Sequence, residues 1–377
     1  MTIKMEISLV GIESKEVFDA NSAIWHGNNY ELLDLNFPVL FDPKKIDSNR
    51  NDLLRYRHFL PIENYNDFVS FSEGFTPLIK IKFSSGLIAN IKLDFLFPTG
   101  SYKDRGSMVL MSKIGSLGLK KITQDSSGNA GASVAAYAAK AGINCEVFLP
   151  FETPNSKVAQ IRAYNASVNK VNGNRKETAA IAFEAAKSNY YASHSFNPFF
   201  FQGTKTFAYE VMEQQNWKTP DAVVLPAGNG TLLIGCYIGF TEMFKSGVIS
   251  KIPKLIAIQS ENCAPLAQLQ KNALFNMQSF VTTDTIAEGI AIPNPVRAKQ
   301  MIEAIEGSLG EIITVTESEI INAWKEMAAM GYLIEPTSAA TIAGLLKYGL
   351  GSNQTENLVS LFSGTGLKSM DKIQKMI

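Results

Sequence analysis

The chain has 377 residues, 46% hydrophobic and 19% charged, and its 35 Lys and Arg side chains balance 35 Asp and Glu side chains. This composition is typical of a globular protein of about two domains and provides no broad basic surface for nucleic acid or membrane lipid. The N-terminal residues include early acids and no long apolar run, so we expect no signal peptide, no membrane span and a cytoplasmic protein. Its three cysteines are far apart and predict neither a disulfide framework nor a metal site.

Residues 1–70 mix short strand-like runs with turns, and we interpret them as an N-terminal extension. Beyond them, strand-length apolar runs alternate with segments of helical periodicity. Strands are predicted at "KITQD", "NCEVFLP", "DAVVLPAG", "KLIAIQS" and "NLVSLFSG", and an alanine-rich helix is predicted to end at Gly142. Thr316 and Glu319 predict a capping box for a helix near the end of the chain.

This alternation predicts an α/β fold of two domains with mainly parallel sheets and a ligand cleft between the domains. We expect a large domain from residues 71–105 and 205–377 and a small domain from residues 106–204.

Lys103 stands in the turn-rich stretch "PTGSYKDRG", directly after the apolar "IKLDFLF". Most lysines are solvated surface charges, and a lysine at a helix start is open to that interpretation. A positive charge there opposes the helix dipole, however. An amine in this place is suited to covalent chemistry, for example a Schiff base with an aldehyde cofactor.

Two small-residue turns follow predicted strands and precede predicted helices. In "DSSGNAGAS", backbone N–H groups are placed to bind a carboxylate or phosphate, and Asn129 offers an amide to a ligand oxygen. In "LPAGNGTLLIG", the turn suits a phosphate and consists of Gly228, Asn229, Gly230 and Thr231. It is not GxGxxG and lacks the Walker lysine, which favours a phosphate-bearing cofactor over a dinucleotide or ATP. Each turn alone is also compatible with an ordinary strand-to-helix connection.

The stretch "LFSGTGLKS" follows the last predicted strand, where Ser363 or Thr365 offers a neutral hydroxyl to a ring nitrogen. An aspartate would keep a pyridine nitrogen protonated, whereas a hydroxyl would leave it neutral and the cofactor a milder electron sink. Taken singly, the stretch favours a tight turn.

Together these stretches resemble the fold type II, tryptophan synthase β-like enzymes that depend on pyridoxal 5'-phosphate, and most closely the threonine synthase family. The resemblance runs from about residue 55 to the end and rests on ordered stretches: "LLRYRHFLP", "SEGFTPL", "PTGSYKDRG", "SSGNAGAS", "NPFFFQGTKTFAYEV", "LPAGNGT", "TIAEGIAIPNPVR", "EPTSAAT" and "SGTGLK". It implies pyridoxal phosphate as cofactor, a small amino acid as substrate and a homodimer.

The resemblance also assigns roles to matching residues. Lys103 would form the Schiff base and then act as acid and base, Asn129 would bond the cofactor's ring oxygen, and Ser363 would face the pyridine nitrogen. The turn from Gly228 to Thr231 would cradle the cofactor phosphate. Positions implied to contact substrate are Ser126, Ser127, Gly128, Ala130, His194 and Phe200.

The chain departs from the family pattern at three positions: Phe75 replaces an asparagine, Ala130 a threonine and Phe200 a basic residue. Each lost charge-assisted hydrogen bond is worth about 1.5–3 kcal/mol, and an aromatic wall desolvates a phosphate without offering a partner. Three functions stay open. They are threonine synthase with Lys157 or Arg162 as the replacement phosphate ligand, a serine/threonine dehydratase-like or cysteate-synthase-like enzyme, and a non-catalytic relative that keeps the cofactor.

Overall fold

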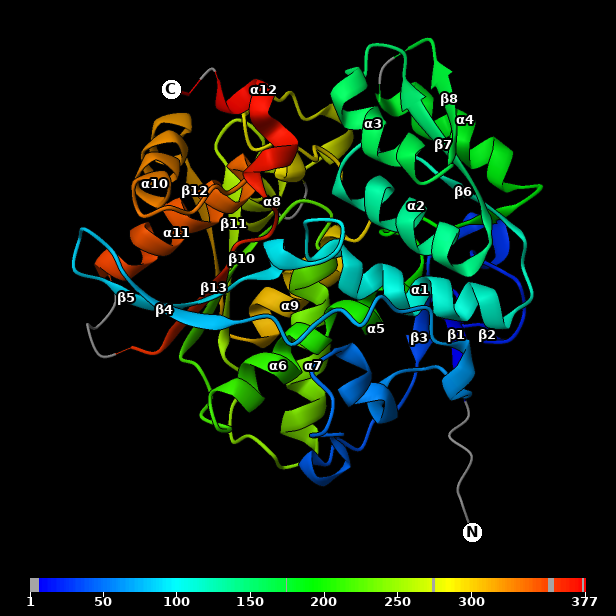
Figure 1. Ribbon diagram of the computed structural model, residues 1–377, viewed down its shortest axis with the longest axis horizontal. Coiled ribbons are helices and arrows are strands. Elements are labelled where there is room, and N and C mark those ends of the chain that lie inside the picture. The colour runs from blue at the N-terminus through cyan, green and yellow to red at the C-terminus, as the bar shows by residue number, and fades with distance from the viewer. Residues whose placement is uncertain (1–6, 174, 273–274, 352–355, 375) are drawn as a thin grey trace. The chain divides into compact units, whose positions relative to one another are not determined.

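The computed structural model describes residues 7–173, 175–272, 275–351, 356–374 and 376–377. Two compact units divide the chain (Figure 1). The first contains the residues up to Gly74 together with Lys103–Thr204, and the second contains Phe75–Tyr102 together with Lys205–Ile377. Parallel sheets flanked by helices occur in both units and confirm the predicted α/β class. Among the described residues, no helix has the length and apolarity needed to cross a membrane.

The first unit contains a parallel four-stranded sheet in the order β8-β7-β6-β9. Its strands are β6 (Lys121–Gln124), β7 (Asn144–Pro150), β8 (Ser167–Val171) and β9 (Tyr190–Tyr191). Its helices are α1 (Lys103–Ser116), α2 (Asn129–Ala141), α3 (Asn155–Ala163), α4 (Arg175–Ala186) and α5 (Pro198–Thr204). Gly142 adopts φ 66° directly after α2, which confirms the predicted end of that helix.

The N-terminal residues of this unit form an antiparallel sheet in the order β2-β1-β3. Its strands are β1 (Ser8–Gly11), β2 (Val17–Asp19) and β3 (Leu33–Asn36), followed or interrupted by 3-10 helices at Asn28–Tyr30, Pro43–Lys45, Leu53–Phe59 and Tyr65–Asp67. Trp25 joins this segment to α4, because its Nε1 donates to the carbonyl of Ala186 at 3.3 Å and its ring lies edge-on to Phe183. The N-terminal segment is therefore packed into the first unit.

The second unit contains a six-stranded sheet in the order β12-β11-β10-β13-β5-β4, with only β4 and β5 antiparallel. The strands are β4 (Leu78–Lys82), β5 (Ile88–Lys92), β10 (Ala222–Pro226), β11 (Lys254–Ser260), β12 (Glu311–Val315) and β13 (Leu358–Leu361). The helices are α6 (Thr206–Gln214), α7 (Thr231–Lys245), α8 (Pro265–Lys271), α9 (Ala298–Gly307), α10 (Glu317–Ala329), α11 (Pro336–Gly351) and α12 (Met370–Ile373). Short 3-10 helices lie at Asp94–Leu96, Met277–Ser279, Glu288–Ile290 and Gly366–Ser369.

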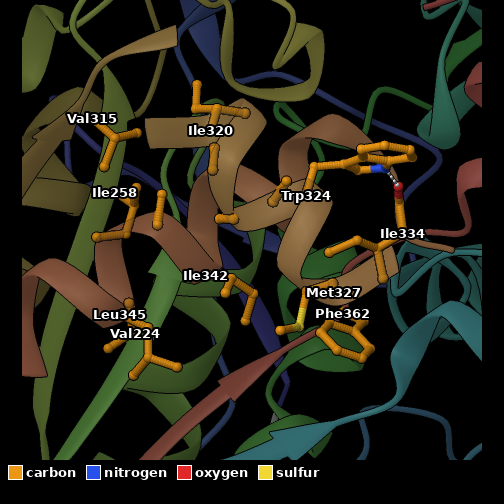
Figure 2. Packing of buried hydrophobic residues seen from close by; sticks show 14 of the residues in the cluster. Val224, Ile258, Val315, Ile320, Trp324, Met327, Ile334, Ile342, Leu345 and Phe362 are labelled. Carbon is orange, nitrogen blue, oxygen red and sulfur yellow. Dashed lines mark hydrogen bonds between the residues drawn. The ribbon is translucent and has the colours of Figure 1, made fainter. Parts of the chain in front are cut away.

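The core of the second unit lies between this sheet and two long helices (Figure 2). Every residue of β10 is buried, as expected for a central parallel strand covered on both faces. Trp324 of α10 is buried among aliphatic side chains, and its Nε1 donates to the carbonyl of Ile334 at 3.0 Å. The predicted capping box is confirmed, because Thr316 and Glu319 exchange side-chain and backbone hydrogen bonds at the start of α10.

Candidate functional site

The residue before Lys103 is held by two of the loops that the sequence singles out. In the second unit, the backbone N–H of Tyr102 donates to the carbonyl of Ser363 at 3.0 Å, and the Tyr102 hydroxyl lies 2.9 Å from Oγ1 of Thr231. Tyr102 follows β5, whereas Ser363 and Thr231 follow β13 and β10, and these three strands are parallel neighbours. Ligand sites of α/β proteins form at such carboxyl ends. Lys103 follows Tyr102 directly in the chain, so it is one residue from the position that contacts the loops of Ser363 and Thr231.

The turn between β10 and α7 depends on glycine. Gly230 has φ 73°, in the left-handed region, and a Cβ there would lie 2.5 Å from the Met301 side chain. A Cβ on Gly228 would lie 2.7 Å from the carbonyl oxygen of Gly289. Neither Gly228 nor Gly230 finds an acceptor for its amide within the described part of the chain. These N–H groups at the start of a 15-residue helix are available to an anion such as a phosphate.

The loop after β13 contains one buried hydroxyl. Ser363 is fully buried, and its Oγ donates to Oε1 of Glu335 at 2.8 Å and lies 3.0 Å from Oγ of Ser338. Thr365 has a different role, because its Oγ1 accepts the N–H two residues later and caps a 3-10 helix. Of the two hydroxyls that the sequence leaves open, Ser363 is therefore the one buried beside Tyr102.

Ser101 adds another buried hydroxyl to this part of the second unit. It pairs with Gly364 in an isolated antiparallel bridge and is fully buried, yet its Oγ has no hydrogen-bond partner within the described ranges. A buried polar atom without a partner is uncommon in proteins, and this hydroxyl is available to a bound water or ligand.

In the first unit, Lys103 begins α1 beside an aromatic wall. Its Nζ lies 5.9 Å from the ring centroid of Phe200, and the imidazole of His194 lies 6.0 Å from that same ring. Phe200 is fully buried, and Gly106 makes room for it: a Cβ on Gly106 would lie 2.3 Å from the ring. The structure thus brings Lys103, His194 and Phe200 together, as three of the predicted site residues.

The "SSGNAGAS" turn lies at the carboxyl end of β6, and His194 follows the neighbouring strand β9. Asn129 begins α2, and the Ser126 hydroxyl accepts the N–H of Gly128 at 3.3 Å. A Cβ on Gly131 would lie only 1.8 Å from the Ser126 carbonyl, so this turn requires glycine. Ser127 and Asn129 are half-buried and Ala130 is buried.

The hydroxyl of Ser133 connects this turn's helix to the helix of the lysine. Ser133, one turn into α2, donates from its Oγ to Oδ1 of Asp104 at 2.6 Å, and Asp104 follows Lys103 directly. Both residues are fully buried. The first turns of α1 and α2 are therefore fixed side by side in the first unit.

Comparison with known proteins decides the family. The model of the family described as "Pyridoxal-phosphate dependent enzyme" matches residues 69–364. The chain belongs to this family. Among curated members, the threonine synthase of Methanocaldococcus jannaschii is 35% identical over 341 residues, which are 87% of this chain and 83% of that protein. The threonine synthase of Bacillus sp. is 33% identical, covering 85% of this chain and 90% of that protein. The chain is thus a threonine synthase-like lyase that depends on pyridoxal phosphate.

Solved structures of this pyridoxal-phosphate dependent family show the same fold. Threonine deaminase isoform 2 from Solanum lycopersicum superposes with a TM-score of 0.70 at 23% identity, over 90% of this chain and 95% of that one. The serine racemase of Dictyostelium discoideum superposes with a TM-score of 0.64 at 25% identity, over 78% of this chain and 92% of that one.

The residues of the second unit fit the family's cofactor. Pyridoxal phosphate needs anion donors for its phosphate and a polar partner for its ring nitrogen. The amides of Gly228 and Gly230 would provide the former, and the buried hydroxyl of Ser363 would provide the latter. The Ser101 hydroxyl and the backbone position of Tyr102 were not predicted from sequence. In the sequence, the one sign that Ser101 and Tyr102 belong to a site is that they stand next to Lys103.

Two residues proposed as replacement phosphate ligands receive no support. Arg162 is exposed at the end of α3, and the side chain of Lys157 lies outside the described residues. Phe75 has φ 44°, a left-handed conformation that asparagine tolerates better than phenylalanine. Its N–H donates to Oε1 of Glu210 at 3.0 Å in the second unit.

A separate pocket of about 490 Å³ lies at the opposite, amino ends of β10 and β11. It is lined by Asp221, Lys251, Ile252, Lys254, Ser308, Leu309, Tyr348 and Glu356. Its charges are mixed, and Lys251 pairs with Asp221 at 2.8 Å. This pocket is remote along the strands from the glycine turn.

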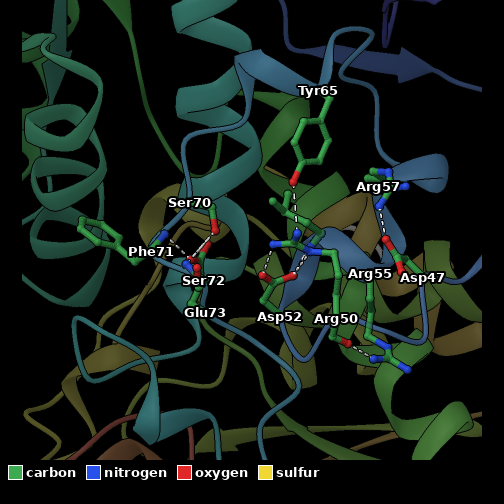
Figure 3. Close-up of polar contacts among 11 residues, drawn as sticks. Asp47, Arg50, Asp52, Arg55, Arg57, Tyr65, Ser70, Phe71, Ser72 and Glu73 are labelled. Carbon is green, nitrogen blue, oxygen red and sulfur yellow. Dashed lines mark hydrogen bonds and ion pairs between the residues drawn. The ribbon is translucent and has the colours of Figure 1, made fainter.

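Polar residues in and beside the "LLRYRHFLP" and "SEGFTPL" stretches make ion pairs and hydrogen bonds in the first unit (Figure 3). Asp52 caps the 3-10 helix at Leu53–Phe59 and pairs with Arg50, while Arg57 pairs with Asp47 at 2.5 Å. The Glu73 carboxylate accepts from the Ser70 hydroxyl at 2.8 Å. These contacts therefore stabilise the segment that leads to Phe75.

From the burial of Glu73 we predict that the free energy of unfolding depends on pH. Burial is the largest cause that raises the pKa of Glu73 above 4.5, so the folded protein binds its proton more tightly than the unfolded chain. Stability from this group is present below pH 4.5 and is lost as the pH rises through the folded pKa. We expect Glu73→Gln, which keeps the hydrogen-bond acceptor, to gain stability relative to wild type with rising pH. Urea unfolding of both proteins between pH 4.5 and 8 measures this, and a difference that stays constant would contradict it.

Proposed function

We propose that Lys103 is the covalent anchor of the cofactor and the group that moves the substrate's α-proton. The observation that carries this proposal is the double contact of Tyr102, which fixes the residue before Lys103 to the loops of Thr231 and Ser363. When bound, pyridoxal phosphate withdraws electrons from the substrate's α-carbon and lowers the cost of removing its proton. The amine of Lys103 accepts that proton and returns it, which is the role of a general acid and base.

The other residues act by binding and orientation. The N–H groups at the start of α2, from Ser126 to Asn129, would hold the substrate carboxylate, because an anion is favoured at a helix N-terminus. The Asn129 side chain would bond the ring oxygen of the cofactor, and the turn from Gly228 to Thr231 would hold its phosphate. The fully buried Phe200 ring would exclude water near Lys103.

The curated relatives named threonine synthase support O-phosphohomoserine as the substrate, which with water would give threonine and inorganic phosphate. A specific observation favours a second candidate. Phe200 and Ala130 are buried near the start of α1 and α2 and offer no side-chain hydrogen bond to a phosphate leaving group. Serine or threonine would suit such a wall better, because each loses its hydroxyl group as a neutral water molecule and, after hydrolysis, yields a keto acid and ammonia.

Turnover assays of the holoprotein distinguish these candidates. Phosphate release from O-phosphohomoserine supports the first substrate, and keto-acid formation from serine or threonine supports the second. Lys103→Ala provides the matched control, because it should lose either activity. A wild-type protein that takes up the cofactor and turns over none of the three amino acids would contradict the enzymatic proposal and leave a cofactor-binding relative. Two further proposals are a homodimer, which the family resemblance implies, and a cytoplasmic location, which the sequence composition favours. Light scattering tests the first.

A further inference from the structure

Ser363 belongs to a chain of hydrogen bonds whose direction can be assigned. The Oγ of Ser338 accepts the backbone N–H groups of Ser363 at 2.8 Å and Gly364 at 3.2 Å. Its own proton is therefore directed to Ser363 Oγ, at 3.0 Å, or to the Gly364 carbonyl, at 3.3 Å. A hydroxyl has one proton to donate and two lone pairs. Ser363 donates its single proton to Oε1 of Glu335 at 2.8 Å, so only a lone pair is left for another partner.

The fold holds the Glu335 carboxylate in this position. Its backbone N–H donates to the Gly364 carbonyl at 3.0 Å, and the residue is 7% exposed. Gly364 is required for this approach, because a Cβ there would lie 2.4 Å from the Glu335 carboxyl group. The space that the missing side chain leaves is filled by the carboxylate itself.

The carboxylate also lies where a negative charge is stabilised. Glu335 directly precedes Pro336, the first residue of α11, and its carbonyl accepts the N–H of Ala339 at 3.1 Å. Proline at the first position of a helix is typical, and the N-terminus of a 16-residue helix favours an anion. The helix N-terminus thus favours the ionised form of Glu335. An ionised carboxylate has no proton, so it acts as the acceptor in its hydrogen bond with Ser363.

We propose that Glu335 is a positioning residue that turns Ser363 into a hydrogen-bond acceptor and thereby keeps the cofactor's pyridine nitrogen protonated. This inference rests on the proposed cofactor site, in which Ser363 faces that nitrogen. A ring nitrogen that meets a lone pair can form a hydrogen bond only if it carries a proton, and the negative charge behind Ser363 favours that proton further. A protonated ring is a stronger electron sink. The hydroxyl alone predicts the opposite, a neutral ring nitrogen.

The test is the protonation state of the ring nitrogen. We would reconstitute the protein with pyridoxal phosphate labelled with ¹⁵N in the ring and record its ¹⁵N NMR shift. Wild type is expected to show the pyridinium shift, and Glu335→Gln, which removes the charge, a shift toward neutral pyridine. Glu335→Asp retains the charge but shortens the reach to Ser363, and its signal is expected between the two. Ser338→Ala is the matched control, because it changes the same turn while the bond from Ser363 to Glu335 remains.

Each outcome decides a different point. A wild-type protein that binds the cofactor with a neutral ring nitrogen overturns the inference without any variant. Identical pyridinium shifts in wild type and Glu335→Gln overturn the role of Glu335. If Ser338→Ala moves the signal as far as Glu335→Gln, the effect comes from the turn and the inference is wrong. Failure of wild type to take up the cofactor contradicts the proposed function instead, which keeps the two claims separable.

Discussion

Lys103→Ala is expected to remove the visible absorbance of the holoprotein and to lower kcat by at least about 10³-fold. Without the amine there is no covalent anchor and no group to carry the α-proton, and general acid–base catalysis alone contributes about 10²–10⁴-fold. Absorbance spectra after addition of pyridoxal phosphate and single-turnover kinetics with an accepted amino acid measure both effects.

Two matched variants separate chemistry from folding. Lys103→Arg retains a cation of similar reach at the start of α1 but cannot form the bond, so it should lose the band as completely as alanine does. Lys113→Ala changes another lysine of the same helix, whose Nζ donates to Asn21 at 2.7 Å, and should keep the band. A normal band in Lys103→Ala would remove the basis of the proposed function.

The largest effect on stability is expected at the ion pair of Lys92 and Glu210 in the second unit. Their N···O distance is 2.6 Å and both side chains are fully buried. The Lys92 ammonium also donates to Gln214 at 2.7 Å, so the pair is well satisfied. Removing one partner leaves an uncompensated buried charge, which costs about 3–5 kcal/mol. We therefore expect Lys92→Met to lose about that much free energy of unfolding, measured by urea denaturation.

The exposed ion pair of Lys251 and Asp221 provides the control. It has a similar distance, 2.8 Å, but its side chains are 56% and 41% exposed, so Lys251→Met should cost about 0–1 kcal/mol. In the double variant Lys92→Met/Glu210→Gln, the loss should be smaller than the sum of the single losses, because neither charge is then stranded. If Lys92→Met and Lys251→Met lost equal free energies of unfolding, the buried ion pair would stabilise the protein no more than the exposed one.

The regular elements near the site were predictable because their signals are local. The strand at Ala222–Pro226 is a short apolar run that ends in glycines, and the box at Thr316 needs only residues within one turn. Gly142 likewise marks the end of α2 by its own backbone preference. Such features depend on neighbours along the chain, which a sequence displays directly.

Other features were missed because they depend on distant contacts. Strand β12, Glu311–Val315, is short and was not predicted, and it forms by pairing with β11 at a sheet edge. Helix α5, Pro198–Thr204, was not predicted as helix from three consecutive phenylalanines. The direction of the Ser363 hydrogen bond was beyond the sequence as well, because Glu335 is 28 residues away and donor directions follow only from geometry.

The close packing of Phe200 against Gly106 limits how the substrate preference of the enzyme can be changed. Because the ring lies where a methyl group at position 106 would be, the two positions behave as one volume shared between neighbours. Trimming the aromatic alone would open a void, and enlarging the glycine alone would force a collision. Engineering of the proposed substrate pocket should therefore vary the two positions together. We also expect substitutions at one position to be tolerated only with a matching change at the other.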